Sequence, residues 1–470
     1  QDADGDGRAE IREKLYEGFT EGNPQLRING LVWGPDNWVH LANGLSSRGE
    51  IRSTKSGAKV EVQGFDVRIR PDTGEIETQT GASQFGVAFD DWGNRFGVSN
   101  ANPLFHYVLE DRYLRRNPYV VPPELKIDVS ETPRQQKIFP RSRPGRFFHE
   151  SQAGRFTSAN SAMFLRETAW GEQFHGNSFV SEPVHNLVHR EIVEPKGVTF
   201  TSRRPADEQD REFLASADTW FRPATLRTGP DGALWLADMY REVIEHPQWI
   251  PIDRMLNLDL RSGSDRGRIY RIYPEKLRAE LRPIPNLTKL EAGELVEVLS
   301  SSNGTVRDMA RKFIVLEKKK ECVVPLRKLA AEAPEAATRI AALETLAGLG
   351  ALSAEGVLAA MSDEHAEVRR RAYRLSEDVL EAAPVSRFRG PEESDPRAIV
   401  QILCSAGCWS DEASTASLIR YGLSPYADPY VLAAAASSMN NEQLAKLVET
   451  MLASDPALGS GMFRHCAVTA

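Results

Sequence analysis

The sequence contains 470 residues with 58 basic and 66 acidic side chains, which gives a formal net charge of −8. A hydrophobic fraction of 41% beside 26% charged residues is typical of a folded globular protein and excludes a disordered or fibrous chain. The acidic balance argues against a protein that mainly binds nucleic acid, and no apolar run reaches the roughly 18 residues of a membrane-spanning helix.

The chain opens on an acidic loop in which aspartates alternate with other residues. Asp-Ala-Asp-Gly-Asp-Gly at residues 2–7 gathers carboxylate oxygens around one point, and its last glycine permits a sharp turn. Glu13 stands where the twelfth-position ligand of a calcium loop would be. We therefore expect a Ca2+ site, with a solvated acidic turn as the alternative, formed by Asp2, Asp4, Asp6, Glu10 and Glu13.

Three segments share one pattern of an apolar strand, a turn and a second apolar strand. They are residues 29–39, 85–98 and 224–238, and their turns carry the Asp, Asn and Gly residues that tight hairpins require. Alternation of apolar and polar residues on either side predicts strands with one buried face.

The spacing of these segments predicts repeated β-blades. Asp36 and Asp91 lie 55 positions apart, close to the roughly 40–50 residues of a four-stranded propeller blade. We expect residues 1–278 to form an all-β propeller. About four blades fit this length, which is few for a closed ring. We therefore expect an incomplete propeller whose first blades precede Gln1.

A first polar motif lies in residues 179–190, which the pattern predicts to be strand, turn and strand. It contains Glu182, His185 and His189. Residues four apart on a strand are separated by about 13 Å, too far for two histidines to share one metal ion. These side chains either satisfy hydrogen bonds inside a blade, or Glu182 and His185 lie at the mouth of the channel.

A second polar motif surrounds the third predicted hairpin. Arg222 begins an expected inner strand, and the next strand is followed by Asp238, Tyr240, Arg241, Glu245 and His246. Arginine, carboxylates and hydroxyls gathered after a strand are suited to an anion or polyol ligand. Buried ion pairs between neighbouring blades explain the same residues equally well.

Composition changes near residue 280. Residues 1–278 hold 30 of the 38 aromatic side chains and seven of the nine histidines, whereas all four cysteines lie in residues 279–470. Helical starts at Arg307, Arg339 and Arg369 are spaced by 32 and 30 residues. This period predicts an all-α, HEAT-like solenoid over residues 279–470, a kind of architecture that commonly docks protein partners.

The motifs in their order resemble a known family. Asp-x-Asp-Gly-Asp-Gly, Asn29-Gly-Leu-x-Trp-Gly, the Asp-Asp-Trp-Gly-Asn run at 90–94, residues 182–190 and residues 238–247 are similar to the large exported proteins of planctomycetes and verrucomicrobia called membrane-bound dehydrogenases. The resemblance covers residues 1 to about 275. It implies a propeller, HEAT-like repeats, export to the periplasm or cell surface, and often a cytochrome c domain, which this chain would meet as a partner.

The same resemblance extends more distantly to soluble quinoprotein glucose and sorbosone dehydrogenases, and it implies pyrroloquinoline quinone as cofactor. Arg222 matches a cofactor-binding arginine of that pattern, and Arg27 is one residue from Leu26, which replaces the catalytic histidine. Leucine cannot accept a proton, so His185 or His246 would serve as the base.

We therefore expect an exported sugar dehydrogenase-like protein with a sugar-like ligand in a polar channel. Its substrate-binding residues would be Asn29, Glu182, Asp238, Tyr240, Arg241 and Glu245. The alternative is a non-catalytic protein that binds glycans or another protein.

Overall fold

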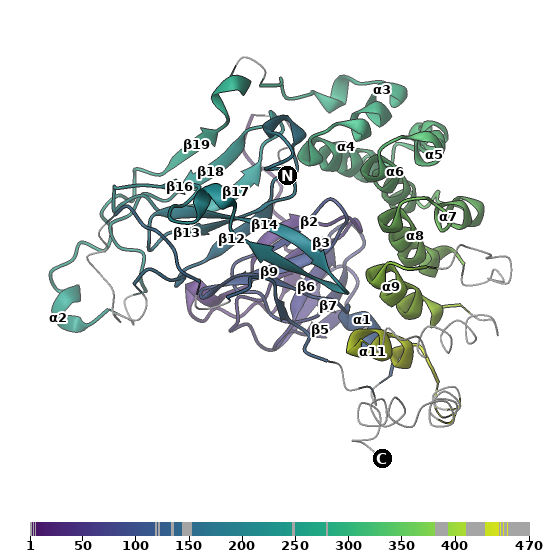
Figure 1. Cartoon of the computed structure of the whole chain (residues 1–470), viewed down its shortest axis with the longest axis horizontal. Coiled ribbons are helices and arrows are strands. Elements are labelled where there is room, and N and C mark those ends of the chain that lie inside the picture. The colour runs from purple at the N-terminus through teal and green to yellow at the C-terminus, as the bar shows by residue number, and fades with distance from the viewer. Residues whose placement is uncertain are drawn as a thin grey trace.

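The computed structural model describes residues 2, 4, 6–117, 120, 123–132, 136–142, 153–246, 250–278, 281–380, 393–409, 428–440, 442, 445 and 449. Antiparallel sheets make up the first part of the chain, and an arc of helices lies along one side of them (Figure 1). The last strand ends at Ile272, and the helical region proper begins at Ala292.

The strands of the first part form, within the described residues, five separate sheets. Each pairing is antiparallel, as expected where short turns join consecutive strands. One sheet has the order β1-β4-β5, from β1 (Tyr16–Glu17), β4 (Glu50–Ser53) and β5 (Lys59–Glu61). The next has the order β2-β3-β6-β7, from β2 (Asn29–Trp33), β3 (Val39–Ala42), β6 (Asp66–Arg70) and β7 (Glu75–Gln79).

The remaining sheets follow in chain order. The third has the order β11-β10-β9-β8, from β8 (Val87–Phe89), β9 (Arg95–Ser99), β10 (Asn102–His106) and β11 (Ile127–Asp128). The fourth joins β12 (Asn160–Phe164), β13 (Ser178–Glu182), β14 (Leu187–Lys196) and β15 (Thr199–Arg203), with β16 (Leu214–Ala215) paired to β14. The fifth contains β17 (Pro223–Thr228), β18 (Leu234–Asp238) and β19 (Arg268–Ile272). Two short helices, α1 (Asp111–Leu114) and α2 (Ile252–Met255), interrupt the strands.

The three hairpins predicted from the sequence are confirmed. β2 pairs with β3, β8 with β9, and β17 with β18, each through a turn of a few residues. Asn37, Gly93 and Gly232 adopt positive φ angles of 62°, 78° and 89° in these turns, a conformation that Asn and Gly tolerate. The sequence therefore predicted both the strands and the turn chemistry.

The sheets pack against one another through their apolar faces. Phe96 and Leu104 of one sheet meet Phe164 and Val180 of the next in a common cluster. A second cluster packs Phe179 against strands of the fifth sheet. Alternation along each strand produces these buried faces, and their burial stabilises the contact between sheets at roughly 25 cal/mol per Å² of apolar surface.

The propeller predicted for residues 1–278 is wrong. The described strands form several small antiparallel sheets, and none of them closes on itself or completes a propeller. Strand β19 ends the fifth sheet as an edge with Ile269 71% exposed. Strand alternation and turns are local properties, whereas closure of sheets around one axis depends on distant contacts that local spacing does not encode.

The second part of the chain is helical. Its helices are α3 (Ala292–Glu297), α4 (Gly304–Leu316), α5 (Val323–Glu332), α6 (Ala336–Gly348), α7 (Ala354–Ala360), α8 (Ala366–Val379), α9 (Pro396–Ala406) and α11 (Pro429–Ser437). Helices α4, α6, α8 and α9 face the sheets, while α5 and α7 lie on the outer side (Figure 1). No helix in the described ranges is long and apolar enough to cross a membrane.

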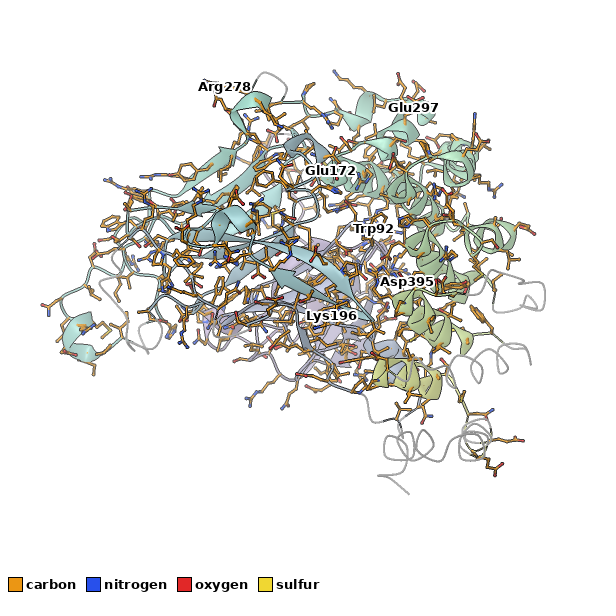
Figure 2. All side chains as sticks on the ribbon, viewed as in Figure 1. Trp92, Glu172, Lys196, Arg278, Glu297 and Asp395 are labelled. Atoms are coloured by element: carbon orange, nitrogen blue, oxygen red, sulfur yellow. The ribbon has the colours of Figure 1, made fainter. Side chains whose placement is uncertain are left out.

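The predicted hairpin turns dock on the helical region. The Asn37 amide donates to the carbonyl of Glu344 on α6 at 2.9 Å, and Arg370 of α8 donates to the carbonyl of Trp92 at 2.6 Å. Asn303, which caps α4, donates to the carbonyl of Gly229 at 2.8 Å. Trp92 lies in the zone where strands face helices, and side chains fill the space between the ribbons there (Figure 2).

The regularly spaced arginines play equivalent structural roles. Arg339 donates to the carbonyl six residues earlier, at Ala333, and to the carboxylate of Asp363, 24 residues later. Arg369 repeats this arrangement with Asp363 and Glu393. Arg307 also donates to a carbonyl six residues earlier, at Ser301.

Arg307 differs from its counterparts in its acidic partner. The position 24 residues later is Ala331, which offers no carboxylate. Arg307 instead pairs with Asp91 in the β8–β9 turn. The first arginine of the series therefore ties the helical region to the sheets.

Candidate functional site

The acidic side chains of the N-terminal loop lie close together. Carboxylate oxygens of Asp2, Asp4, Asp6 and Glu10 lie within 4.8 Å of one another, and all four residues are exposed. The Asp4 carboxylate accepts the backbone N–H of Asp6 at 3.1 Å, so part of the loop is internally bonded. Glu13 does not belong to this group. The oxygen donors fit Ca2+ in chemical type.

Glu182, the last residue of β13, and His185, three residues later, are fully buried. The Glu182 carboxylate accepts backbone N–H groups from Thr157 at 3.2 Å and Ser158 at 2.9 Å. His185 Nδ1 lies 3.2 Å from Glu182 Oε1, and His185 Nε2 accepts the N–H of Gly154 at 3.2 Å. Glu182 and His185 thus have the hydrogen-bonded arrangement that was one of the two interpretations of the sequence.

Arg222 links two loops through their backbones. Its guanidinium donates to the carbonyls of Pro183 at 2.8 Å, Arg241 at 2.9 Å and Glu242 at 2.9 Å. Asp238 accepts the N–H of Arg222 at 2.7 Å. Arg222 therefore joins the loop after β13 of the fourth sheet to the loop after β18 of the fifth.

The residues after β18 form a loop at the edge of the fifth sheet. The Tyr240 ring lies 3.6 Å from the Arg268 guanidinium, and Arg241 donates to the carbonyl of Arg261 at 2.9 Å. Glu245 accepts the N–H of His246 at 2.9 Å.

The N-terminal candidates also bind backbone groups. Arg27 donates to the carbonyl of Gly22 at 3.2 Å, and the Asn29 amide donates to the carbonyls of Arg27 and Gln84, both at 2.8 Å. Because Arg27 and Arg222 both direct their donors at main-chain carbonyls, they do not form a cradle for pyrroloquinoline quinone.

A cavity that contains none of these candidate residues lies where the sheets meet helices α4 and α6. We call it the junction cavity. It has a volume of about 300 Å³ and is lined by residues of β2, β8, β12 and β17 together with those two helices. The edge strands β2, β8, β12 and β17 lie side by side, which brings their side chains to one place. Its apolar wall includes Trp33, Phe89, Met163, Phe164 and Met309.

Two cations of the junction cavity have no carboxylate partner among the described residues. Arg227 donates to the carbonyl of Leu226 at 2.7 Å and approaches Ser161 Oγ at 3.5 Å. Burial lowers the pKa of the Arg227 guanidinium, although its side chain is open to the cavity. The Lys312 ammonium lies 5.7 Å from the centre of the Trp33 ring.

The neighbouring charges of this cavity are paired. Asp91 accepts Arg166 Nε at 2.6 Å and also pairs with Arg307 and His175. Burial opposes its charge, but Arg166 and Arg307 outweigh that effect and hold the pKa of Asp91 well below its usual value. Arg227 and Lys312 are therefore the cavity cations available to a ligand.

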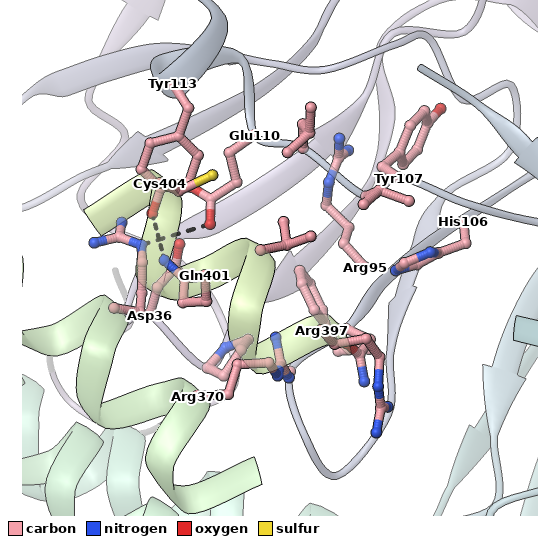
Figure 3. Close-up of a pocket in the computed structure, with 18 of the residues that line it drawn as sticks. Asp36, Arg95, His106, Tyr107, Glu110, Tyr113, Arg370, Arg397, Gln401 and Cys404 are labelled. Atoms are coloured by element: carbon pink, nitrogen blue, oxygen red, sulfur yellow. Dashed lines mark hydrogen bonds and ion pairs between the residues drawn. The ribbon is translucent and has the colours of Figure 1, made fainter. Parts of the chain in front are cut away.

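A smaller cavity of about 90 Å³ lies between the second and third sheets and helices α8 and α9 (Figure 3). Six arginines line it, so we call it the arginine cavity: Arg68, Arg95, Arg370, Arg371, Arg374 and Arg397. Asp36 and Glu110 are the carboxylates in its lining.

These features define a two-part protein in which antiparallel sheets and a helical region enclose cationic cavities between them. The chain belongs to the family described as Domain of unknown function (DUF7133), which matches residues 1–276. No curated protein matches the chain.

Sequence patterns did not predict the cavities or the cations Arg227 and Lys312 that line the larger one. Exposed and buried side chains alternate at the end of β17. Thr225 and Arg227 are exposed, and Leu226 and Thr228 are buried. This alternation could have indicated an arginine on the open face of β17. No such alternation marks Lys312 or the arginines of α8 and α9. They line a cavity only because of the sheet that each helix faces, and that packing is not visible in the sequence.

Proposed function

We propose that this protein binds a small carboxylated organic molecule of the sugar-acid class in the junction cavity. The observation that carries the proposal is the pair of cations, Arg227 and Lys312, that face the cavity without a carboxylate partner among the described residues. A guanidinium binds a carboxylate through two parallel hydrogen bonds, and such bonds are stronger where water is excluded.

The size and the walls of the cavity support the same ligand class. A volume of about 300 Å³ is at the lower end of small-molecule pockets, which favours a ligand of monosaccharide size. Trp33 contributes an aromatic wall, and its buried indole N–H has no acceptor in the described part of the chain.

We propose binding of this ligand, with no oxidation step through His185 or His246. A general base must lie within reach of the proton that it removes. His185 has both ring nitrogens in contact with protein groups, and neither His185 nor His246 lines the junction cavity.

Isothermal titration with glucuronate, galacturonate and gluconate, each compared with glucose, tests the proposal. We expect the acids to bind and Arg227→Gln to weaken them by about 10- to 100-fold, the loss of one charged hydrogen-bonding group. Arg203→Gln is the matched control, since Arg203 is half-exposed and paired with Glu194 on the surface. Equal binding of glucose and the acids, or undiminished binding by Arg227→Gln, would refute the proposal.

For the N-terminal loop we propose Ca2+ binding as a separate property. The proposal rests on the calcium-loop spacing of Asp2, Asp4 and Asp6 in the sequence. Calorimetric titration with Ca2+ should give a saturable heat that Asp4→Ala removes. An intact chain without such heat would end this proposal.

A further inference from the structure

The arginine cavity differs from the junction cavity in size and in charge. Its volume of about 90 Å³ is about a third of the roughly 300 Å³ of the junction cavity, which favours one compact anion over a ligand of sugar size. It lies between strands and helices, so any bound group would touch both parts of the protein.

Charges inside this cavity are segregated. The lining carboxylates Asp36 and Glu110 lie at one end, whereas His106, Arg95 and Arg397 lie at the other (Figure 3). At the acidic end, Asp36 pairs with a lining arginine at 2.7 Å. The end around His106 has no lining carboxylate in the described part of the chain.

Three arginines reach the His106 end from different elements, and acidic partners outside the lining hold them in place. Arg95 of β9 pairs with Asp66 at 3.0 Å, and Arg370 of α8 pairs with Glu367 at 2.7 Å. Arg397 of α9 pairs with the same glutamate at 2.7 Å.

Each of these arginines keeps one nitrogen without an acceptor among the described residues. Arg95 uses both Nη atoms, on Asp66 and a carbonyl. Arg370 uses Nε and Nη2, and Arg397 uses Nη1 and Nη2. The remaining nitrogens are Nε of Arg95, Nη1 of Arg370 and Nε of Arg397, three donors fixed by the pairs behind them.

His106 responds to this concentration of positive charge. It is buried, and its Nδ1 lies 3.0 Å from Thr199 Oγ1. Burial together with the charges of Arg370, Arg397 and Arg95 lowers the pKa of His106 to about 3. The ring is therefore neutral near pH 7, and the positive charge at this end of the cavity comes from the three arginines.

We propose that the His106 end of the arginine cavity is a binding site for one tetrahedral oxyanion, inorganic phosphate or sulfate, held by Arg95, Arg370 and Arg397. The anion accepts from donors on β9, α8 and α9 and so joins the sheets to the helical region. Arginine is the residue that best matches the geometry of such anions. This site is independent of the carboxylated ligand of the junction cavity.

The test is isothermal titration of the full chain at pH 7 with phosphate and with sulfate, and with chloride at equal ionic strength. We expect saturable one-to-one binding of phosphate or sulfate, a matching rise in melting temperature, and neither with chloride. Arg397→Gln should weaken binding at least tenfold, Arg397→Lys should weaken it less, and Arg203→Gln should bind as the wild type does.

Several results would overturn the proposal. Absence of saturable phosphate and sulfate binding by the wild type does so without any variant, so a misfolded variant cannot obscure the answer. An equal thermal shift with chloride would indicate general screening. Loss of binding in Arg227→Gln but not in Arg397→Gln would place the anion in the junction cavity instead.

Discussion

Asp91 and its neighbour Asp90 allow a direct test of how the two parts are joined. Asp91 pairs with Arg166 from the sheets and with Arg307 from α4, and its side chain is 8% exposed. Asp91→Asn keeps the volume and removes the charge that both guanidinium groups face. We expect this single change to loosen α4 from the sheets.

The magnitude follows from burial and from the partners that remain. Removing one partner of a buried ion pair costs about 3–5 kcal/mol. Arg166 keeps Asp308, and Arg307 keeps the carbonyl of Ser301, so the lower end applies. A cost of about 3 kcal/mol corresponds to a roughly 100-fold larger population of the opened state.

Hydrogen exchange by mass spectrometry is the suitable assay, because a two-part chain of 470 residues need not unfold in one step. Protection of the α4 amides at pH 6 should fall about 100-fold in Asp91→Asn. The control is Asp90→Asn: burial, opposed by Asn94, raises the pKa of Asp90 to about 6, so a neutral amide replaces a half-protonated acid there. We expect a change below about fivefold.

The two aspartates also differ in the sign of their pH dependence. Asp91 has a lowered pKa, so its stabilisation is present above the ordinary value of 3.8 and is lost as the pH falls below it. Asp90 has a raised pKa, so stability decreases as the pH rises from 3.8 to about 6. Equal loss of α4 protection in both variants, or less than a threefold change in Asp91→Asn, would refute this reasoning.

Three further predictions concern the packing. Burial opposes the charge of His189, but two flanking glutamates raise its pKa to about 9. Wild-type stability should therefore fall as the pH rises from 6.5 through 9. The urea midpoint of His189→Gln should change less over the same pH range. Arg339→Lys should lower the hydrogen-exchange protection of the α6 amides by roughly 5- to 30-fold, equivalent to about 1–2 kcal/mol, because lysine cannot reproduce both 2.8 Å bonds to Asp363. Unchanged protection would contradict this. Gly30→Ala should lower the melting temperature more than Gly86→Ala. A Cβ on Gly30 would lie 2.5 Å from the Gly86 Cα, whereas a Cβ on Gly86 would have no neighbour closer than 4.0 Å. The reverse order of melting temperatures would contradict this.

The repeated arginines illustrate how far local sequence can predict a contact. Spacing alone identified Arg307, Arg339 and Arg369 as equivalent positions at helix starts. Each binds the carbonyl six residues earlier, a contact that the helix start itself dictates. The acidic partner of Arg307 lies 216 positions away at Asp91, and nothing in the repeat could have predicted it.

The candidate site shows the same division. Sequence motifs drew attention to Glu182, His185, Arg222 and Asp238, and these buried residues hydrogen-bond mainly to the backbone. Asp238 Oδ2 is the exception, with no partner among the described residues. The motifs predicted that these side chains are buried and hydrogen-bonded. They could not distinguish a structural network from a ligand site, because both require the same polar side chains.

By itself the sequence determined the hairpins, their turns and the change from strands to helices near residue 280, because alternation, turn residues and helical periodicity act over a few positions. Only the tertiary structure decided that the sheets stay separate and that their turns dock on α4, α6 and α8. It also decided where the cavities lie. Arg227 and Lys312 are 85 positions apart and line the same cavity only because the edge strands of the sheets face α4. Such contacts depend on how whole elements pack, which no local pattern specifies.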